Sequence, residues 1–213
     1  MPRPETTRIP LLPLHSVLFP GGQVPLRIFE PRYLRMIRSC ISTQEAFGVV
    51  LIAEGEEVGQ AADICPVGTL ARISDWQQKA NDLLQLTVVG QERFQVLSLS
   101  VQPDQLLLAE TLPINKEMTT SIPDGFDRLR TYLDQALEEL GVQDTVPERY
   151  LNDARWVSYR ITELLPLPLN KKQWLLELTD PVLRLDALQQ QLPNPGSTKV
   201  HHLPASIRDL LDS

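Results

Sequence analysis

Cysteine and histidine could hold a metal ion in this chain, because both are common ligands of structural zinc. Cys40 and Cys65 stand alone, without a CxxC pair, and His15 lies in an apolar segment near the N-terminus. His201 and His202 have no cysteine or carboxylate at ligand spacing. Since a zinc site normally needs three or four ligands, the sequence predicts structural cysteines, no metal site and no cofactor.

Charged side chains beside dense apolar sequence are the second group of candidates. Glu30, Arg32, Arg72 and Arg93 occupy such positions. An unpaired buried charge is very unfavourable, so we expect these groups to pair with one another and to hold the first helix to the neighbouring strands. A role in gripping the terminus of a peptide is the alternative. No group of residues in the chain predicts a catalytic site.

Three arginines, Arg32, Arg35 and Arg38, are spaced at i, i+3 and i+6. On a helix this spacing forms a basic stripe. A solvated helix face is the favoured interpretation, and a docking surface for an acidic partner is the alternative.

Aromatic side chains could line a groove for a polypeptide. Phe19 and Trp76 flank predicted turns, where aromatic side chains are more often accessible, so both are candidate peptide-binding residues. Trp156 sits beside a helical face, and we expect it in the core.

The elements that position these residues begin with two apolar runs, Ile9 to Phe19 and Val24 to Phe29. Pro20-Gly21-Gly22-Gln23 separates them and favours a turn, so the runs predict a hairpin. Prolines in these strands must lie at ends, edges or bulges, because proline donates no ladder hydrogen bond. From Pro31 onward, apolar residues recur at helical spacing, which predicts a helix that leaves the second strand.

Five further strands follow, and the fourth of them changes its pattern midway. Phe94 and Val96 set one phase of apolar alternation, whereas Leu97 and Leu99 set the opposite one. A slip of one residue predicts a β-bulge, and bulges bend strands as a small closed or half-closed barrel requires. The predicted strands are residues 46–53, 67–76, 84–90, 94–101 and 106–112.

The pattern after Pro123 is helical. Apolar residues from Phe126 to Leu140 trace one face, a capping box at Thr145 opens a helix that runs to Leu164, and Asp180 caps another. The chain is therefore predicted to be α+β. A β-barrel subdomain with one inserted helix takes residues 1–117, a helical bundle takes residues 118–195, and a loosely packed tail takes residues 196–213.

Charge and hydropathy exclude several kinds of partner. The formal net charge is −7 and is spread over both halves of the chain, so we expect no nucleic acid partner. No apolar run approaches the roughly 20 residues that span a bilayer, and the N-terminus lacks the apolar segment of a signal peptide. These features predict a cytoplasmic protein with free thiols and no membrane partner.

The segment PLLPLHSVLFPGGQVPLRIFEPRY, from Pro10 to Tyr33, resembles the opening of the Lon N-terminal, substrate-binding domain, as found in short bacterial proteins made of that domain alone. The segments VGTLARI at Val67, VGQERF at Val89 and LLPLPLNKKQWLLELTD at Leu164 match in family order. Glu30, with the arginines at positions 32, 72 and 93, stands at the charged positions of these motifs. The resemblance implies a PUA-like pseudo-barrel that binds protein segments.

Full-length Lon is an ATP-driven protease, but this chain has no Gly-Lys dipeptide for a P-loop, and its five lysines all lie in polar stretches unsuited to a Ser–Lys pair. We therefore expect no enzyme activity. The predicted function is binding of unfolded or extended polypeptide, as an adaptor or holder in protein quality control. A scaffold that docks one dedicated folded protein is the alternative. RNA binding, known among PUA-like folds, is disfavoured by the negative charge.

Overall fold

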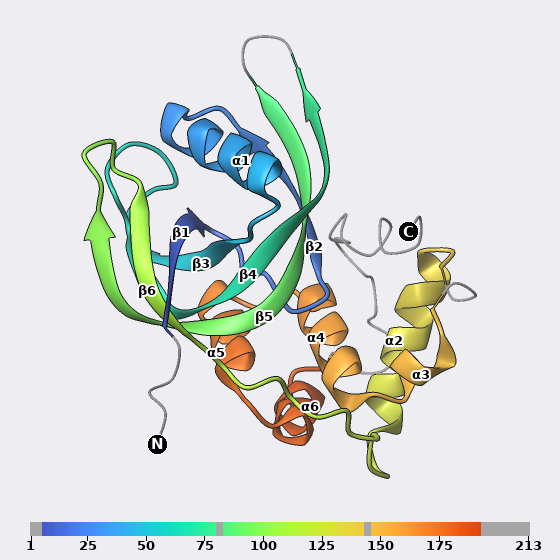
Figure 1. The fold of residues 1–213 in the computed structure, drawn as a ribbon. Helices are drawn as coiled ribbons and strands as arrows, with labels where there is room; N and C mark the ends of the chain where they lie inside the picture. The colour runs from blue at the N-terminus through green and yellow to red at the C-terminus, as the bar shows by residue number, and fades with distance from the viewer. Residues whose placement is uncertain (1–5, 80–82, 143–145, 193–213) are drawn as a thin grey trace. The chain divides into compact units, whose positions relative to one another are not determined.

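The computed structural model describes residues 6–79, 83–142 and 146–192. The chain divides into two compact units, residues 1–116 and 117–213 (Figure 1). Six strands and one helix precede a group of helices, which confirms the predicted α+β class. The predicted tail, residues 196–213, and the cap at Thr145 lie outside the described residues. The elements are β1 Thr7–Leu14, β2 Gln23–Ile28, α1 Pro31–Thr43, β3 Phe47–Glu54, β4 Asp63–Gln78, β5 Leu84–Val101, β6 Leu107–Pro113, α2 Asp127–Glu139, α3 Glu148–Leu151, α4 Ala154–Leu164, α5 Leu169–Glu177 and α6 Pro181–Gln189.

The six strands form one mixed sheet in the order β2-β5-β4-β3-β1-β6, and an additional pairing of β5 with β6 brings the sheet round into a nearly closed ring. β1 runs parallel to β3, and the other pairings are antiparallel. Among the described strands β2 pairs only with β5, so it is an edge strand outside the closed ring and its other edge is unpaired. This arrangement confirms the predicted partly closed barrel.

The predicted hairpin between the first two apolar runs is wrong. β1 pairs with β3 and β6, whereas β2 pairs with β5. The connecting segment crosses β5 at Gly90: the Gly21 N–H donates to the Gly90 carbonyl, and the Gly90 N–H donates to the Gly22 carbonyl, both at 2.8 Å. Turn-forming residues specify a reversal of the chain but not which strands become neighbours. Pro25 is tolerated because β2 is an edge strand.

β5 is one continuous strand that joins the two strands predicted at 84–90 and 94–101. One of its edges pairs with β4, and the other is divided between β2, along residues 84–89, and β6, along residues 94–101. The register with β6 shifts between Val96 and Ser98, which confirms the predicted bulge. Such a shift bends the strand, so β5 can serve two partners that lie in different directions.

α1 packs its apolar side against the sheet, as its helical spacing of apolar residues predicts. Figure 1 shows this helix lying across the strands of the ring. The shared core fixes where the N-terminal end of α1 sits beside β2. Its buried members are Leu12, Leu14, Leu18, Leu26, Ile28, Tyr33, Leu34, Met36, Ile37, Cys40, Phe47, Val49, Ala71, Leu84, Leu86 and Val88.

A second cluster fills the rest of the ring around Phe94, which is 1% exposed. Two glycines leave room for the aromatic ring of Phe94. A Cβ at Gly48 would lie 2.6 Å from Phe94 Cζ, and a Cβ at Gly68 would lie 2.7 Å from the same atom. Gly68 and Gly90, which stand in the VGTLARI and VGQERF segments, are therefore places of close packing. Gly90 is the tighter of the two, since a Cβ there would lie 2.2 Å from the Phe19 carbonyl oxygen.

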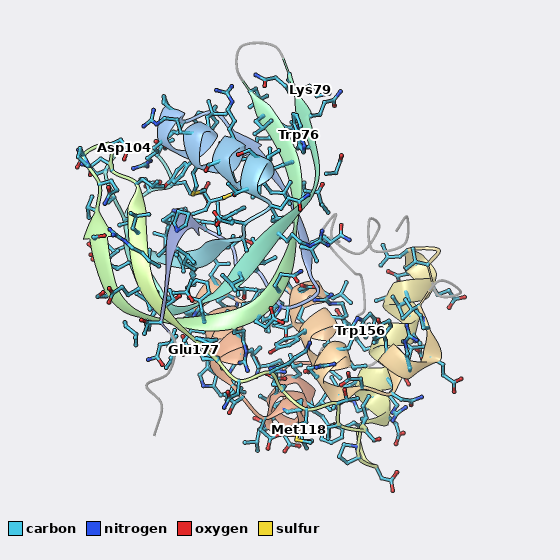
Figure 2. The ribbon with its side chains drawn as sticks, in the orientation of Figure 1. Trp76, Lys79, Asp104, Met118, Trp156 and Glu177 are labelled. Carbon is cyan, nitrogen blue, oxygen red and sulfur yellow. The ribbon has the colours of Figure 1, made fainter. Side chains whose placement is uncertain are left out.

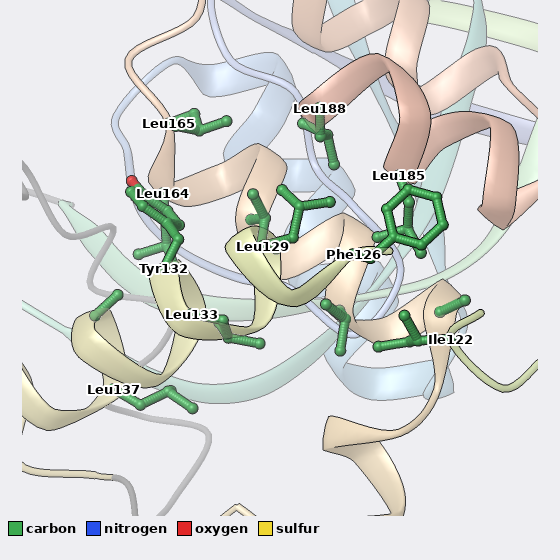
Figure 3. Close-up of a cluster of buried hydrophobic side chains, with 14 of the residues drawn as sticks. Ile122, Phe126, Leu129, Tyr132, Leu133, Leu137, Leu164, Leu165, Leu185 and Leu188 are labelled. Atoms are coloured by element: carbon green, nitrogen blue, oxygen red, sulfur yellow. The ribbon is translucent and has the colours of Figure 1, made fainter. Parts of the chain in front are cut away.

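The helices of the second unit share an apolar core drawn in Figure 3, with residues from α2, α4 and α6 facing one another. The single helix predicted from residue 145 to 164 is broken: α3 ends at Leu151, and Asp153 then caps α4 by accepting from the Arg155 N–H at 3.0 Å. The cap at Asp180 is confirmed, since its carboxylate accepts from the Val182 N–H at 2.8 Å. Trp156 packs against this core but is only partly buried.

Arg184 lies fully buried in the helical unit and is paired with Glu117. The guanidinium also donates to Ser158 Oγ at 3.0 Å and to the Leu175 carbonyl at 2.9 Å. The Tyr159 hydroxyl donates to Glu117 Oε1 at 2.6 Å. Because the pair is surrounded by further hydrogen bonds, we interpret it as a structural centre of this unit.

A second buried ion pair joins Glu163 to Arg160 at 2.9 Å, with side chains 9% and 1% exposed. The Lys172 ammonium donates to the Glu163 carbonyl at 3.0 Å. Burial raises the pKa of Glu163 to about 7, although the neighbouring Arg160 and Lys172 charges act to lower it. The carboxyl therefore titrates near neutral pH in the folded chain.

Replacing Gly90 with alanine should lower the free energy of unfolding by about 1–3 kcal/mol, because the added methyl group overlaps the Phe19 carbonyl. Urea unfolding followed by circular dichroism measures the change. Gln95→Ala, an exposed position on the same strand, is the control and should shift the midpoint little. Equal midpoints for the two variants would contradict the close crossing at Gly90.

Arg184→Leu should destabilise the chain by about 3–5 kcal/mol, because it leaves the Glu117 carboxylate buried without its cation. Differential scanning calorimetry can compare it with Arg128→Leu, which alters an exposed arginine of α2. The double variant Glu117→Leu/Arg184→Leu should recover part of the loss, because no buried charge remains. A double variant as unstable as Arg184→Leu would argue against the pairing.

Ionisation of the buried Glu163 carboxyl should lower the free energy of unfolding as the pH rises from about 4.5 to about 7. In this window the folded state binds more protons than the unfolded state, because the folded pKa is the higher one. The loss should be on the order of 3 kcal/mol. Urea unfolding at about pH 5 and about pH 7.5 measures the loss. Glu163→Gln should abolish this dependence of the free energy of unfolding on pH. Glu138→Gln, which alters an exposed carboxylate, is the control and should keep it.

Candidate functional site

The open edge of β2 faces a groove of about 330 Å³ that we call the β1–β2 groove. It lies between two strands that do not pair with each other. Apolar side chains make up most of its wall, so the groove suits an apolar ligand of limited size. Its lining residues are Leu12, Pro13, Leu14, Ser16, Val24, Pro25, Leu26, Arg27, Ile28, Phe29, Glu30, Tyr33, Glu57 and Val58.

Some main-chain N–H and C=O groups of β2 do not pair with β5 and point toward this groove. Gly22 accepts from the Gly90 N–H, and the antiparallel register continues from Gln23 opposite Val89 to Ile28 opposite Leu84. Alternate residues of an antiparallel strand turn their N–H and C=O groups to opposite edges. Counting from Gly22, the groups of Gln23, Pro25 and Arg27 turn away from β5, and Pro25 has no N–H to satisfy there.

The β1 side of the groove also has an open edge. β1 pairs with β6 only through Thr7–Leu11, so residues 12–14 pair with β3 on one side alone. The gap between β1 and β2 is therefore bordered by strand edges on both sides. An extended segment placed in the gap could pair its main chain with either edge, as added strands do in other sheets.

Two large apolar side chains stand exposed at the rim of the groove. Phe29 is 61% exposed and directly follows β2, and Val58, in the loop after β3, is 47% exposed. The sequence held a signal for each. Phe29 follows Ile28 without a polar residue between them, so the two cannot both face the core of one strand. Val58 is an apolar residue inside an acidic loop.

Two carboxylates, those of Glu30 and Glu57, line one end of the groove. Glu30 lies 3.0 Å from the Nε of Arg32 as an ion pair, and the Arg32 guanidinium, 4% exposed, also donates to the Gln105 carbonyl at 2.9 Å. Glu57 Oε1 accepts from the His15 N–H at 2.7 Å. Arg32 thus anchors the start of α1, and the Glu57 contact holds the loop that carries Val58.

Tyr33 also lines the groove, near enough to Glu30 and Glu57 for both charges to act on it. Burial raises the pKa of its phenol, the charges of Glu30 and Glu57 raise it further, and Arg32 acts in the opposite direction. The hydroxyl therefore remains protonated at neutral pH and can serve as a hydrogen-bond donor or acceptor.

The two aromatic candidates from the sequence are not brought together. Phe19 is 0% exposed and its backbone contacts Gly90, so the expectation that it is accessible is wrong: the segment after β1 folds inward over β5 instead of forming a hairpin turn. Trp76 is 49% exposed, and Figure 2 shows it beside Lys79 where β4 approaches the β4–β5 connection. It does not line the β1–β2 groove. A role of Trp76 in peptide binding stays a prediction.

The four charged candidates from the sequence differ in burial and in whether they form ion pairs. Glu30 and Arg32 pair as expected. Arg93 is buried on β5, but Arg72 is exposed on β4 and joins none of the ion pairs among the described residues, so the expected mutual pairing of all four groups is wrong for Arg72. The strand positions of these residues, set by the sheet register, keep Arg72 on the outer surface.

The arginine stripe of α1 is not a uniformly solvated face. Arg32 is buried against Glu30, whereas Arg35 is exposed and paired with Asp104 in the β5–β6 turn, which Figure 2 labels. The Arg35 hydrogen bond lowers the pKa of the Asp104 carboxyl. Arg38 is exposed. Arg32 is enclosed by Glu30 and by two loops, whose Gln105 and Glu57 carbonyls accept from its guanidinium, and helical spacing alone could not indicate these contacts.

Other chemistry finds little support in the structure. Among residues 6–79, 83–142 and 146–192, no three His, Cys, Asp or Glu side chains gather in a way that could hold a metal ion. No helix in the same ranges has the length and apolarity to cross a membrane. The buried pairs of the helical unit are enclosed by their own protein partners, so we assign them to stability.

Comparison with known proteins places these observations in a family. Residues 8–194 match the family described as ATP-dependent protease La (LON) substrate-binding domain. Lon protease from Anaeromyxobacter dehalogenans is 28% identical over 193 residues, which are 86% of this chain and 23% of that protein. Lon protease 2 from Myxococcus xanthus gives the same values. The chain therefore spans about a quarter of the length of these relatives.

Solved structures agree with the sequence match. A Lon N-terminal domain protein from Xanthomonas campestris has a TM-score of 0.75 and 34% identity, covering 88% of this chain and 99% of that one. The N-terminal domain of a Mycobacterium avium complex Lon protease, at 19% identity, shares the fold with a TM-score of 0.63, covering 86% and 97%. No ATPase or protease domain is found in the 213 residues. The chain belongs to the Lon substrate-binding domain family.

Proposed function

We propose that the chain binds extended polypeptide segments in the β1–β2 groove and carries out no chemistry on them. The bound segment adds a strand to the open edge of β2, and its apolar side chains enter the groove. Main-chain hydrogen bonds then supply affinity without regard to sequence, and the groove supplies a preference for apolar residues. Such a mode suits unfolded or loosely folded proteins.

One observation carries the proposal: the unpaired edge of β2 borders an apolar groove. An exposed strand edge is a template for pairing with another chain, and proteins usually protect it. Here nothing within the described residues of this unit pairs with that edge, and Phe29 and Val58 add exposed apolar surface beside it. Edge, groove and exposed rim together form a surface that a polypeptide segment fits.

The family supports the same function. The matching family is named for substrate binding, and the relatives named Lon protease carry that domain as part of a longer chain. We extend only the binding role to this chain, as an adaptor or holder in protein quality control. The proteolysis of the relatives is not part of the proposal.

A second candidate function is docking of one folded partner. It is favoured by an exposed apolar stripe on the outer half of β5, where Leu97, Leu99 and Val101 are 52%, 46% and 54% exposed. These side chains are held on a rigid strand and suit a matched surface better than a variable peptide. Variants of the stripe and of the groove therefore separate the two functions.

Removing the N–H of Arg27, which turns away from β5, should weaken binding of a polypeptide. Arg27→Pro deletes this donor without removing a hydrogen bond to β5, whereas Arg27→Ala keeps it. Loss of one hydrogen bond corresponds to about 0.5–1.5 kcal/mol, or roughly a twofold to tenfold rise in Kd. Fluorescence anisotropy with a labelled peptide of alternating valine and serine measures the difference between the two variants.

Matched aspartate variants test the groove wall in the same assay. Phe29→Asp and Val58→Asp should weaken binding at least tenfold, because a carboxylate replaces apolar contact surface. Leu99→Asp, an equally exposed apolar position outside the groove, should leave binding unchanged. Weaker binding by Leu99→Asp with normal binding by Phe29→Asp would favour the folded-partner function and contradict the proposal.

A further inference from the structure

The β1–β2 groove has an electrostatic polarity in addition to its apolar wall. Glu30 and Glu57 both line it, at the end where β2 gives way to α1. Glu56, next to Glu57, is 81% exposed and lies 3.9 Å from the His15 imidazole. Three carboxylates thus gather around one end of an otherwise apolar groove.

Cations within the same unit do not fully balance this end. Arg32 pairs with Glu30 and is buried behind the wall, since it does not line the groove. Arg27 also lines the groove, and its side chain is exposed. Together with Gln85, which lies opposite it on β5, Arg27 borders a separate hollow as well. Neither the Glu56 nor the Glu57 carboxylate forms an ion pair with an arginine or lysine among the described residues, so negative charge remains at the α1 end.

Glu30 also has an unused hydrogen-bonding oxygen. Its Oε2 faces Arg32, whereas no group within the described residues donates to its buried Oε1. A carboxylate oxygen that is shielded from water and lacks a donor is unfavourable. Only one oxygen of Glu30 therefore faces a cation, so the pair with Arg32 compensates the charge of this carboxylate on one side alone.

We propose that the groove prefers polypeptide segments in which a lysine or arginine stands two residues from an apolar side chain. This inference rests on the proposed function and specifies its substrate. The apolar residue occupies the wall formed by Leu12, Leu26 and Ile28, and the cation lies between Glu30 and Glu57. The spacing follows from an extended chain, in which residues two apart point to the same side.

Three peptides of equal length test the preference: Lys-Ser-Val-Ser-Lys, Gln-Ser-Val-Ser-Gln and Glu-Ser-Val-Ser-Glu, each embedded in the same serine-rich flanks. The symmetric pattern presents a flanking residue to the acidic end whichever way the peptide runs. The lysine peptide should bind about fivefold to tenfold more tightly than the glutamine peptide, and the glutamate peptide more weakly than both. Added salt should reduce the difference.

Glu57→Gln should remove most of the preference for lysine, measured as the ratio of the affinities for the lysine and glutamine peptides. Glutamine keeps an oxygen that can accept from the His15 N–H, but it carries no charge. Glu92→Gln, an exposed carboxylate outside the groove, should keep the full preference. Equal affinities for the three peptides would overturn the charge preference and leave the proposed function standing. Failure of all three peptides to bind, or binding unaffected by Arg27→Pro, would overturn both.

Discussion

The structure depends on how the second edge of β5 is divided. β4 occupies one edge of this strand, and the other edge is shared by β2 along its first part and β6 along its second. The division falls between Gly90 and Phe94: the chain leading into β2 passes Gly90 so closely that no side chain fits there, and the pairing with β6 begins at Phe94. A bend at the bulge between Val96 and Ser98 lets β6 continue to β1 and close the ring.

The groove is a consequence of this division. β2 pairs with β5 and not with β1, so the space between β1 and β2 stays open with a strand edge on each side. α1 then packs over the sheet and places Glu30 and Tyr33 at one end of that space, with the buried Arg32 behind them. The site therefore consists of features left over by closure of the barrel: an unpaired edge, an apolar wall and an acidic end.

The apolar residues at the rim of this groove differ from the aromatic candidates of the sequence, whereas Glu30, one of the charged candidates, does line it. Phe19 ends the first apolar run of the opening segment, but it is fully buried, and its backbone carbonyl lies at the crossing over Gly90. Trp76 is accessible but lies outside the groove. Phe29 and Val58 carried only weak signals, a break of alternation and an apolar residue in an acidic loop, and needed the fold to show that they share one rim.

The sequence by itself determined the kind of most elements, the helix after Pro31, the bulge near Val96 and the cap at Asp180, because each depends on side chains close together in the chain. It also carried the family resemblance. Only the tertiary structure decided that β1 and β2 are not a hairpin, that Arg32 is buried while Arg72 is exposed, and that an open edge borders an apolar groove. Strand partners and burial arise from contacts between distant segments, and local spacing carries no record of those contacts.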